Sequence, residues 1–276
     1  MTLYLYATSL CNHSCNHCYL GYEGSWNPDN LFEVTKKYID RYEVCINGAE
    51  ILLNLDYLKS LKIAQQRYVF TNGLVFLTNK DTVVESLQAN DVSIIRMSNH
   101  FEAAESLNAV SPILVEKIAS ELMADGFRVE YNTTVTTVNY ENIKTICERA
   151  CRQGIKRIKF FPLMPSGKAN ALESSLYLSK SQIRDFYDSV LEERKKYDIS
   201  DLEIRLGGDF SIVADKFKCG YGIDYLAVTP DRKVYGCPFS ICIGNEIGYL
   251  NDNNEIVLTK TISHSGEKCF YKTYLK

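Results

Sequence analysis

Apolar residues along the first two thirds of the chain follow two alternating spacings. Short runs rich in β-branched and aromatic residues are separated by longer segments in which apolar positions recur every three or four residues. This alternation is typical of an α/β fold with parallel strands. The expected strands cover residues 3–8, 44–47, 68–71, 92–97, 128–136 and 157–161.

Several of the intervening segments have recognisable helix ends. Helices are expected over residues 111–126 and 139–154, where a proline or asparagine stands at the start and a glycine at the end. Residues 179–182 have the spacing of a capping box that begins a third helix. Six βα units are fewer than the eight of a closed barrel, so we predict a partial (β/α)6 TIM-like barrel.

The segments that follow the expected strands are polar or rich in glycine. In barrels of this kind, catalytic residues lie on the loops at the carboxyl ends of the strands. We therefore expect one rim of the barrel to carry the chemistry. It would be formed by residues 11–18, 47–50, 71–73, 98–100 and 162–167.

The first of these segments reads Cys-Asn-His-Ser-Cys-Asn-His-Cys, with three and then two residues between its cysteines. Iron–sulfur cubanes are held by closely spaced cysteine thiolates. Three thiolates, from Cys11, Cys15 and Cys18, would leave one of four irons open to a substrate or cofactor. The alternative is a four-ligand zinc site that His13 or His17 completes.

The βα pattern stops after residue 197, and residues 199–208 are expected to be a linker or a final short strand. Beyond them, residues 225–235 predict a β-hairpin, which would bring Cys219 near Cys237. Together with Cys242 and Cys269, these thiolates could complete a second cubane with no open iron. A zinc ribbon is the alternative, although the spacing of its cysteines differs from the usual CxxC pairs.

Composition and charge exclude several classes of protein. The chain has 276 residues, 46% of them hydrophobic, enough to bury a core without disulfide support. A net charge of −3 without a dense basic block does not favour nucleic-acid binding. Neither a membrane span nor a signal peptide is recognisable. Clustered cysteines in a chain without an export signal indicate metal binding in a reducing compartment, so we expect a cytoplasmic protein.

The segment 11–18 resembles the CxxxCxxC signature of the radical S-adenosylmethionine (SAM) enzymes, with His17 where that family usually has an aromatic residue. The resemblance implies that the three cysteines hold a [4Fe–4S] cluster whose open iron binds SAM. Electron transfer from the cluster would then split SAM into methionine and a 5′-deoxyadenosyl radical. A partial (β/α)6 barrel is also implied, in agreement with the strand count.

Gly48-Ala49-Glu50 resembles the Gly-Gly-Glu motif of that family, whose backbone and acid meet the methionyl amine of SAM. A small residue lets the backbone approach a ligand closely. Ala49 replaces the second glycine, and Ile51 stands where proline is common. The alternative is a strand end with a solvated glutamate.

Two further positions resemble contacts with SAM. Ser98 matches a polar residue that contacts the ribose or carboxylate, and Leu163 lies in the segment 161–165, which resembles one that packs on adenine. Residues 71–73 are expected to shape a turn. Asn139 is explained fully by a helix-capping role.

Three cysteines lie outside both motifs. Cys147 and Cys151 fall on the apolar face of their helix and are expected to behave as small buried residues. The orientation of Cys45 within its strand is left open. A hydrogen-donor role, as in radical epimerases, is one possibility for Cys45.

The C-terminal cysteines resemble the twitch extension, a shortened SPASM domain, of radical SAM enzymes. Four cysteines, in place of the seven of a full SPASM domain, imply one auxiliary [4Fe–4S] cluster. The resemblance divides the chain into a radical SAM core, residues 1–198, and an auxiliary-cluster domain, residues 199–276.

The resemblance implies an enzyme that abstracts a hydrogen atom from a substrate carbon. We favour a maturase that modifies a peptide or protein, because an open six-strand barrel leaves room for a chain. Only ten residues precede Cys11, so the leader-binding domain of many peptide maturases is not expected. The alternatives are a small-molecule dehydrogenase or epimerase and a non-catalytic zinc or iron–sulfur protein. A flavodoxin- or ferredoxin-type electron donor is expected, with no nucleic-acid or membrane partner.

Overall fold

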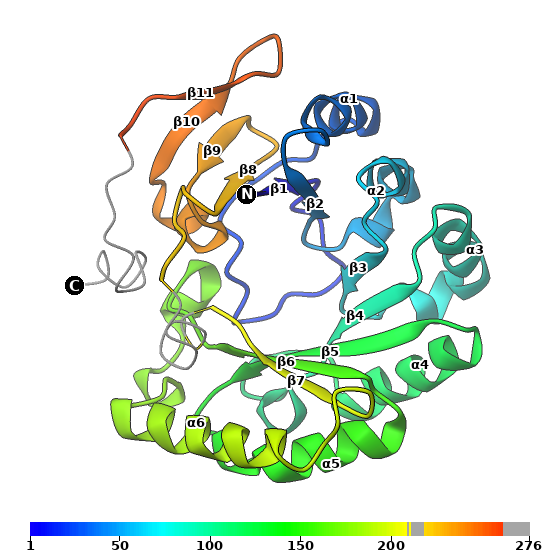
Figure 1. Cartoon of the computed structure of the whole chain (residues 1–276), viewed down its shortest axis with the longest axis vertical. Coiled ribbons are helices and arrows are strands. Elements are labelled where there is room, and N and C mark those ends of the chain that lie inside the picture. Colours follow the sequence, from blue (N-terminus) through cyan, green and yellow to red (C-terminus); the bar gives the residue numbers. More distant parts are fainter. Residues whose placement is uncertain (209, 211–217, 262–276) are drawn as a thin grey trace.

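A computed structural model of the chain describes residues 1–208, 210 and 218–261. Strands and helices alternate through its first 206 residues, and the helices lie along the outer side of an arc of strands (Figure 1). In chain order the elements are β1 (Thr2–Tyr6), α1 (Pro28–Tyr38), β2 (Glu43–Asn47), α2 (Leu58–Ile63), β3 (Tyr68–Thr71), α3 (Phe76–Ala89), β4 (Ile94–Ser98), α4 (Pro112–Ala124), β5 (Arg128–Val135), α5 (Ile143–Gln153), β6 (Arg157–Pro162), α6 (Lys180–Arg194) and β7 (Glu203–Leu206).

The strands form two sheets. One contains β3, β4, β5, β6 and β7 in that order, all parallel. In the other, β1 pairs in parallel with β2 on one side and with β8 (Tyr225–Val228) on the other. The predicted α/β fold with a partial TIM-like barrel is confirmed, and the six expected strands differ from the observed ones by at most two residues at either end.

The segment after residue 198 adds strands to both sheets. Residues 199–208 contain β7, so the short strand, and not the linker, is correct. The predicted hairpin is also present, because β8 pairs antiparallel with β9 (Lys233–Tyr235). β10 (Glu246–Leu250) and β11 (Ile256–Leu258) extend it, again antiparallel.

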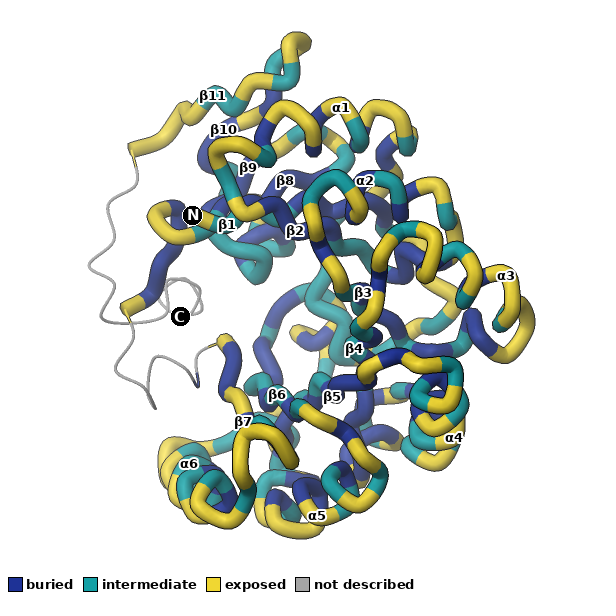
Figure 2. The backbone as a smooth tube through the Cα atoms, turned by 45° about the vertical axis from the view of Figure 1, so that its right-hand side comes forward, coloured by how far each residue is buried: buried dark blue, intermediate teal, exposed yellow. Residues whose placement is uncertain are grey.

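Alternate residues of each strand face opposite sides of the sheet, and the two sides differ in chemistry. The outward side chains, such as Ile95, Ile158 and Phe160, are apolar and fully buried against the helices. Phe160 meets Phe186 of α6 with ring centroids 5.7 Å apart. Figure 2 shows the result, with buried strands inside and exposed residues on the outer surfaces of the helices. Among the described residues, no helix is both long and apolar enough to cross a membrane.

No backbone ladder joins β2 to β3, and the side chain of Gln66 fills that role. Its Oε1 accepts a hydrogen bond from the Ile46 amide at 2.6 Å. Its Nε2 donates to the carbonyl oxygens of Ile46, at 3.0 Å, and Tyr68, at 2.8 Å. Buried backbone groups must be paired, so Gln66 connects the two sheets where ordinary strand pairing is missing.

The predicted helix ends are only partly correct. Ser179 and Gln182 form the expected capping box at the start of α6, and Gly154 ends α5 with φ of 90°. Asn139 stands at the N-cap position of the short 3₁₀ helix Tyr140–Asn142, as expected, but its side chain makes no capping hydrogen bond. Its Oδ1 accepts from the Thr136 amide, and its Nδ2 donates to the carbonyl of His100, so it ties the end of β5 to the segment after β4.

We predict that Gln66→Met lowers the free energy of unfolding by roughly 3 kcal/mol, because it leaves both polar backbone groups of Ile46 buried without partners. Urea denaturation monitored by circular dichroism would measure the change. Gln88→Met, on the exposed side of α3, is the matched control and should change stability by less than about 0.5 kcal/mol. Equal stability of the two variants would contradict the bridging role.

Candidate metal and cofactor site

The three N-terminal cysteines lie on a long loop between β1 and α1. The loop is closed at its base, where Thr8 and Ser25 form a β-bridge and the Ser9 amide donates to the carbonyl of Gly24 at 2.9 Å. It therefore starts at the carboxyl end of β1, on the rim where the sequence placed it.

Residues after β4 hold the middle of this loop. The Asn16 amide donates to the carbonyl of Leu107 at 2.9 Å, and the Asn108 side chain donates to the carbonyl of Ser14 at 2.8 Å. The Nε2 of His13 lies 2.8 Å from the carbonyl oxygen of Asn108. Since a carbonyl can only accept, this nitrogen carries the proton and anchors the loop.

Residues after β6 hold the end of the loop. The Lys168 amide donates to the carbonyl of Cys18 at 2.9 Å, and its ammonium donates to Ser14 Oγ at 2.9 Å. Gly167 adopts φ of 60°, and a Cβ there would lie only 2.6 Å from the Cys18 carbonyl oxygen. Only glycine permits this close contact.

The three thiols are near enough to influence one another. Burial, together with the neighbouring Cys18 and Cys11, raises the pKa of Cys15 to about 12. Burial likewise raises the pKa of Cys11. Within residues 1–208, 210 and 218–261, no three Cys, His, Asp or Glu side chains are grouped as one metal ion requires. In a cubane, each thiolate binds a different iron.

Glu50 is fully buried at the carboxyl end of β2, so the alternative of a solvated glutamate is wrong. Its Oε2 accepts hydrogen bonds from Thr71 Oγ1 and the Asn72 amide, both at 2.9 Å. Its Oε1 has no hydrogen-bond partner among the described residues. Burial raises the pKa of this carboxyl to about 7. A buried carboxylate oxygen without a donor favours a ligand that carries one.

The backbone of the same segment is hydrogen-bonded to the residues just before Cys11. The Ala49 amide donates to the Thr8 carbonyl at 2.9 Å, and the Glu50 amide donates to the Leu10 carbonyl at 3.0 Å. A Cβ on Gly48 would lie 2.6 Å from Ile51 Cγ2. Packing within the protein is therefore one reason for a glycine at position 48.

Asn72 has a role beyond the turn expected for residues 71–73. Its Oδ1 accepts from the Leu74 amide and shapes that turn. Its Nδ2 donates to the Oδ1 of Asn12 at 2.8 Å and to the Sγ of Cys11 at 3.6 Å. Asn72 therefore contacts a proposed metal ligand as well as Glu50, and sequence reasoning missed this role.

His17 lies edge-to-face with His100, with ring centroids 4.4 Å apart. The Nδ1 of His17 lies 3.4 Å from the carbonyl oxygen of Leu107, and the Nδ1 of His100 accepts from the Thr134 amide at 3.0 Å. Burial lowers the pKa of His17 to about 4 and that of His100 well below its usual range. Both rings are therefore neutral. His100 was visible in the sequence only as part of a loop after β4.

Leu163 and Ser98, the two other residues expected to contact SAM, lie on different strands or loops. Leu163 is buried against Leu107, which also holds the cysteine loop. Ser98 ends β4 and pairs in register with Asn132 of β5, with no hydrogen bond from its side chain among the described residues.

The C-terminal cysteines approach one another and the first loop. The Gly220 amide, next to Cys219, donates to the Tyr225 hydroxyl at 3.4 Å, and the Gly222 amide donates at 2.8 Å to the carbonyl of Gly236, next to Cys237. Cys242 Sγ lies 2.7 Å from Ser166 Oγ. A Cβ on Gly21 would lie 2.6 Å from the Cys242 Cα, so this cysteine packs on the segment after Cys18. Cys269 lies outside the described residues.

The three other cysteines also have defined positions. Cys147 is fully buried on α5, as expected, and Cys151 is half-buried against the same core. Cys45 Sγ lies 3.1 Å from the hydroxyl of Tyr68 on β3. The sequence could not fix this orientation, and the structure places Cys45 on the inner side of the strands.

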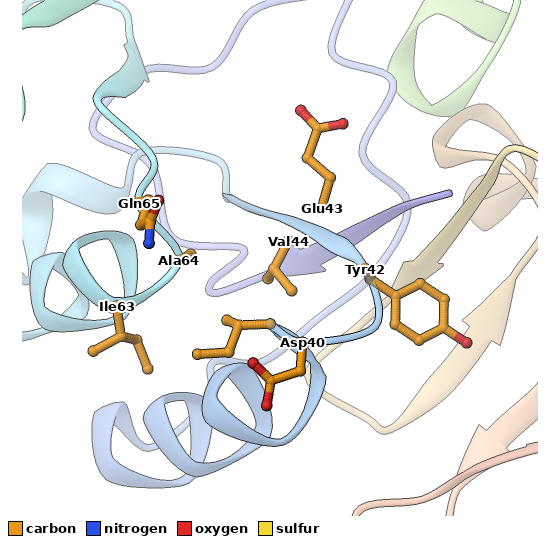
Figure 3. A pocket seen from close by; sticks show the side chains of 8 residues that line it. Asp40, Tyr42, Glu43, Val44, Ile63, Ala64 and Gln65 are labelled. Atoms are coloured by element: carbon orange, nitrogen blue, oxygen red, sulfur yellow. The ribbon is translucent and has the colours of Figure 1, made fainter.

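A pocket of 260 Å³ lies at the opposite end of β2 from the cysteine loop (Figure 3). It is formed by the residues after α1, the start of β2 and the end of α2, including Asp40, Glu43 and Gln65. These residues lie at the amino end of the strand, away from the rim that carries Glu50.

No protein-family model matches the sequence, and no curated protein matches it. Solved structures do share its fold. SuiB of Streptococcus suis, bound to the precursor peptide SuiA, matches with a TM-score of 0.72 and 14% identity, over 100% of this chain and 64% of SuiB. The chain thus spans less than two thirds of SuiB.

Two other structures match over most of the chain. The protein anSMEcpe with bound AdoMet (SAM) matches with a TM-score of 0.68 and 14% identity, over 92% of this chain and 78% of its own. HemN of Escherichia coli, described as a radical SAM enzyme, has a TM-score of 0.53 and 12% identity, over 83% and 62%. At such identities the likeness establishes the fold.

Glu50 predicts a dependence of stability on pH. Burial raises its pKa from 4.5 to about 7, so between these values the folded protein holds a proton that the unfolded chain releases. This contribution to stability is greatest below pH 4.5 and is lost as the pH rises towards 7. From pH 5 to pH 8, the metal-free protein should lose roughly 2 kcal/mol more unfolding free energy than Glu50→Gln. Parallel urea titrations at the two pH values would measure this, and identical pH dependence would contradict it.

Proposed function

We propose that this protein is a radical SAM enzyme, whose [4Fe–4S] cluster is held by Cys11, Cys15 and Cys18. The observation that carries the proposal is the position of the cysteine loop next to Glu50 on the rim of the barrel. Three thiols, two of which raise the pKa of the third, lie on one loop held by the segments after β4 and β6. Glu50, whose buried Oε1 has no partner among the described residues, is hydrogen-bonded through its amide to Leu10 of that loop. A zinc knuckle would not need that carboxylate.

The residues of the rim fit the cofactors that this function needs. Glu50 Oε1 would accept from the methionyl amine of SAM, an interaction that the Gly-Ala-Glu segment also suggests. Asn72 donates to the Sγ of Cys11, and such donors stabilise the thiolate form of a ligand. When bound, cluster and SAM together would supply a 5′-deoxyadenosyl radical for hydrogen abstraction.

The residues of the chain would bind SAM, orient it and shield it from water. His17 and His100 are neutral, and Leu163 adds apolar surface, so this part of the rim can cover an uncharged adenine. Ser98 would contact the ribose or carboxylate of SAM. The protein supplies position and exclusion of water, while the cofactors carry the chemistry.

We propose a peptide or protein as the substrate. SuiB was solved with its precursor peptide, and anSMEcpe was solved with AdoMet and a peptide, and both share this fold. A small-molecule dehydrogenase or epimerase remains the second candidate. A flavodoxin- or ferredoxin-type donor and a cytoplasmic location belong to the same proposal.

We further propose that Cys219, Cys237, Cys242 and Cys269 bind one auxiliary [4Fe–4S] cluster in a twitch-like extension. The hairpin β8–β9 supports this, because the segments that follow Cys219 and precede Cys237 are hydrogen-bonded through Gly222 and Gly236. The division into residues 1–198 and 199–276 is part of this proposal, although β7 and β8 extend the sheets of the first part.

Anaerobic reconstitution tests radical initiation. We expect about eight irons per chain and formation of 5′-deoxyadenosine from SAM after reduction by dithionite. Cys15→Ala should reduce the nucleoside to background, whereas Cys151→Ala, a cysteine outside both sets, should not. Zinc without iron, together with intact SAM, would overturn the proposal.

The auxiliary cluster has a separate test. Cys237→Ala should lower the iron content from about eight to about four per chain, because only the first cubane would keep all of its cysteine ligands. SAM cleavage to 5′-deoxyadenosine should continue, since Cys11, Cys15 and Cys18 are unchanged. Iron content by colorimetry and Mössbauer spectra would measure the loss. An unchanged iron content would overturn the ligand assignment.

A further inference from the structure

The inner side of the five-stranded sheet is charged, in contrast to its apolar outer side. Register pairing places Arg96, Glu130, Arg157 and Glu203 in one row across β4 to β7. The next row, one step nearer the rim, contains Ser98, Asn132, Lys159 and Arg205. Residues paired in register on parallel strands point to the same face.

This face is the one enclosed by the arc of strands. Lys159 lies between Ile158 and Phe160, which are buried against the helices, so its own side chain points inward. The Arg96 guanidinium lies 3.5 Å from the centroid of the Tyr68 ring, whose hydroxyl meets Cys45 of β2. The inward side chains of β2, β3 and β4 are thus in contact.

Cations outnumber carboxylates on this face. Glu130 alone accepts from three guanidinium groups, those of Arg96 at 2.9 Å, Arg128 at 3.0 Å and Arg157. Glu203 is paired with Arg205. Both carboxylates of the two rows are therefore already engaged.

Lys159 has no such partner. Among the described residues, its ammonium makes no hydrogen bond or ion pair and lies 5.0 Å from the centroid of the Phe161 ring. Burial, together with the charges of Arg157, Arg96 and Arg205, lowers the pKa of Lys159 to about 8. A partly buried ammonium among guanidinium groups is costly unless an anion accompanies it.

The neighbours of Lys159 in its row are also unpartnered. The side chains of Ser98 and Asn132 have no hydrogen-bond partner within residues 1–208, 210 and 218–261. Three polar side chains on adjacent strands, β4, β5 and β6, thus lie in one row on the inner face of the sheet.

The backbone is shaped to hold Lys159 there. A Cβ on Gly207, just after β7, would lie 2.7 Å from Lys159 Cε and 2.5 Å from Phe161 Cε1. The glycine therefore gives room to both the cation and the aromatic ring beside it. The ammonium can pair with a carboxylate, and the Phe161 ring beside it can pack on the apolar stem that carries this carboxylate.

We propose that Lys159 and Asn132 bind a carboxylate of the substrate, as carried by an acidic peptide side chain, on the inner face of the barrel. The inference deepens the proposed function, because it assumes that the substrate reaches this face of the sheet. Charge-assisted hydrogen bonds of this kind are among the stronger polar contacts in proteins.

The test compares two small probes, N-acetyl-glutamate N-methylamide and its glutamine analogue, bound to the reconstituted protein at pH 7 and followed by NMR titration. The wild type should bind the glutamate probe on the order of tenfold more tightly. Lys159→Met should abolish this preference, and Lys159→Arg should retain it. Lys156→Met, an exposed lysine before the same strand, is the matched control and should also retain it.

Gly207→Ala tests the site without removing a charge, and it should weaken binding of the glutamate probe by displacing Lys159. Equal binding of the two probes by the wild type, or a preference that survives Lys159→Met, would overturn the proposal. So would a tenfold loss of SAM affinity in Lys159→Met, since the carboxylate would then be that of SAM. Failure to cleave SAM, with the glutamate preference intact, would overturn the proposed function and leave the carboxylate site standing.

Discussion

The barrel depends on two side chains that join β2 to β3, where no backbone ladder exists. Gln66 satisfies the backbone of Ile46 and Tyr68, and Glu50 receives the hydroxyl of Thr71 and the amide of Asn72. Glu50 thereby joins the sheets with one carboxylate oxygen, while the other has no hydrogen-bond partner among the described residues. Its burial, which raises its pKa, follows from this position in the joint between the sheets.

The cysteine loop also depends on contacts with other segments, because it has no helix or strand of its own beyond the bridge at its base. Its shape comes from carbonyl and amide contacts with the segments after β4 and β6. His13 and His17 each use a ring nitrogen for this purpose, on the carbonyls of Asn108 and Leu107. A loop held from outside can present its thiols while the barrel beneath it carries the stability.

Much of the fold could be predicted because period-two and helical patterns report directly on burial. The strand limits, the hairpin and the capping box at Ser179 follow from local sequence. Three findings do not. The joint made by Gln66, the contact of Asn72 with Cys11 and the His17–His100 pair each link residues between 20 and 83 positions apart through side chains. Sequence spacing carries no information about such contacts unless the register of the strands is known.

Register also explains why the charged interior was overlooked. Along the sequence, Arg96, Glu130 and Lys159 are charges at strand positions, each of which could equally be solvated. Pairing β4, β5 and β6 in register turns them into adjacent rows with more cations than carboxylates. Because Glu130 is already shared by three arginines, the excess is concentrated at Lys159. An apolar outer face can stabilise the sheet alone, which leaves the inner face free to carry charges whose partner arrives with a ligand.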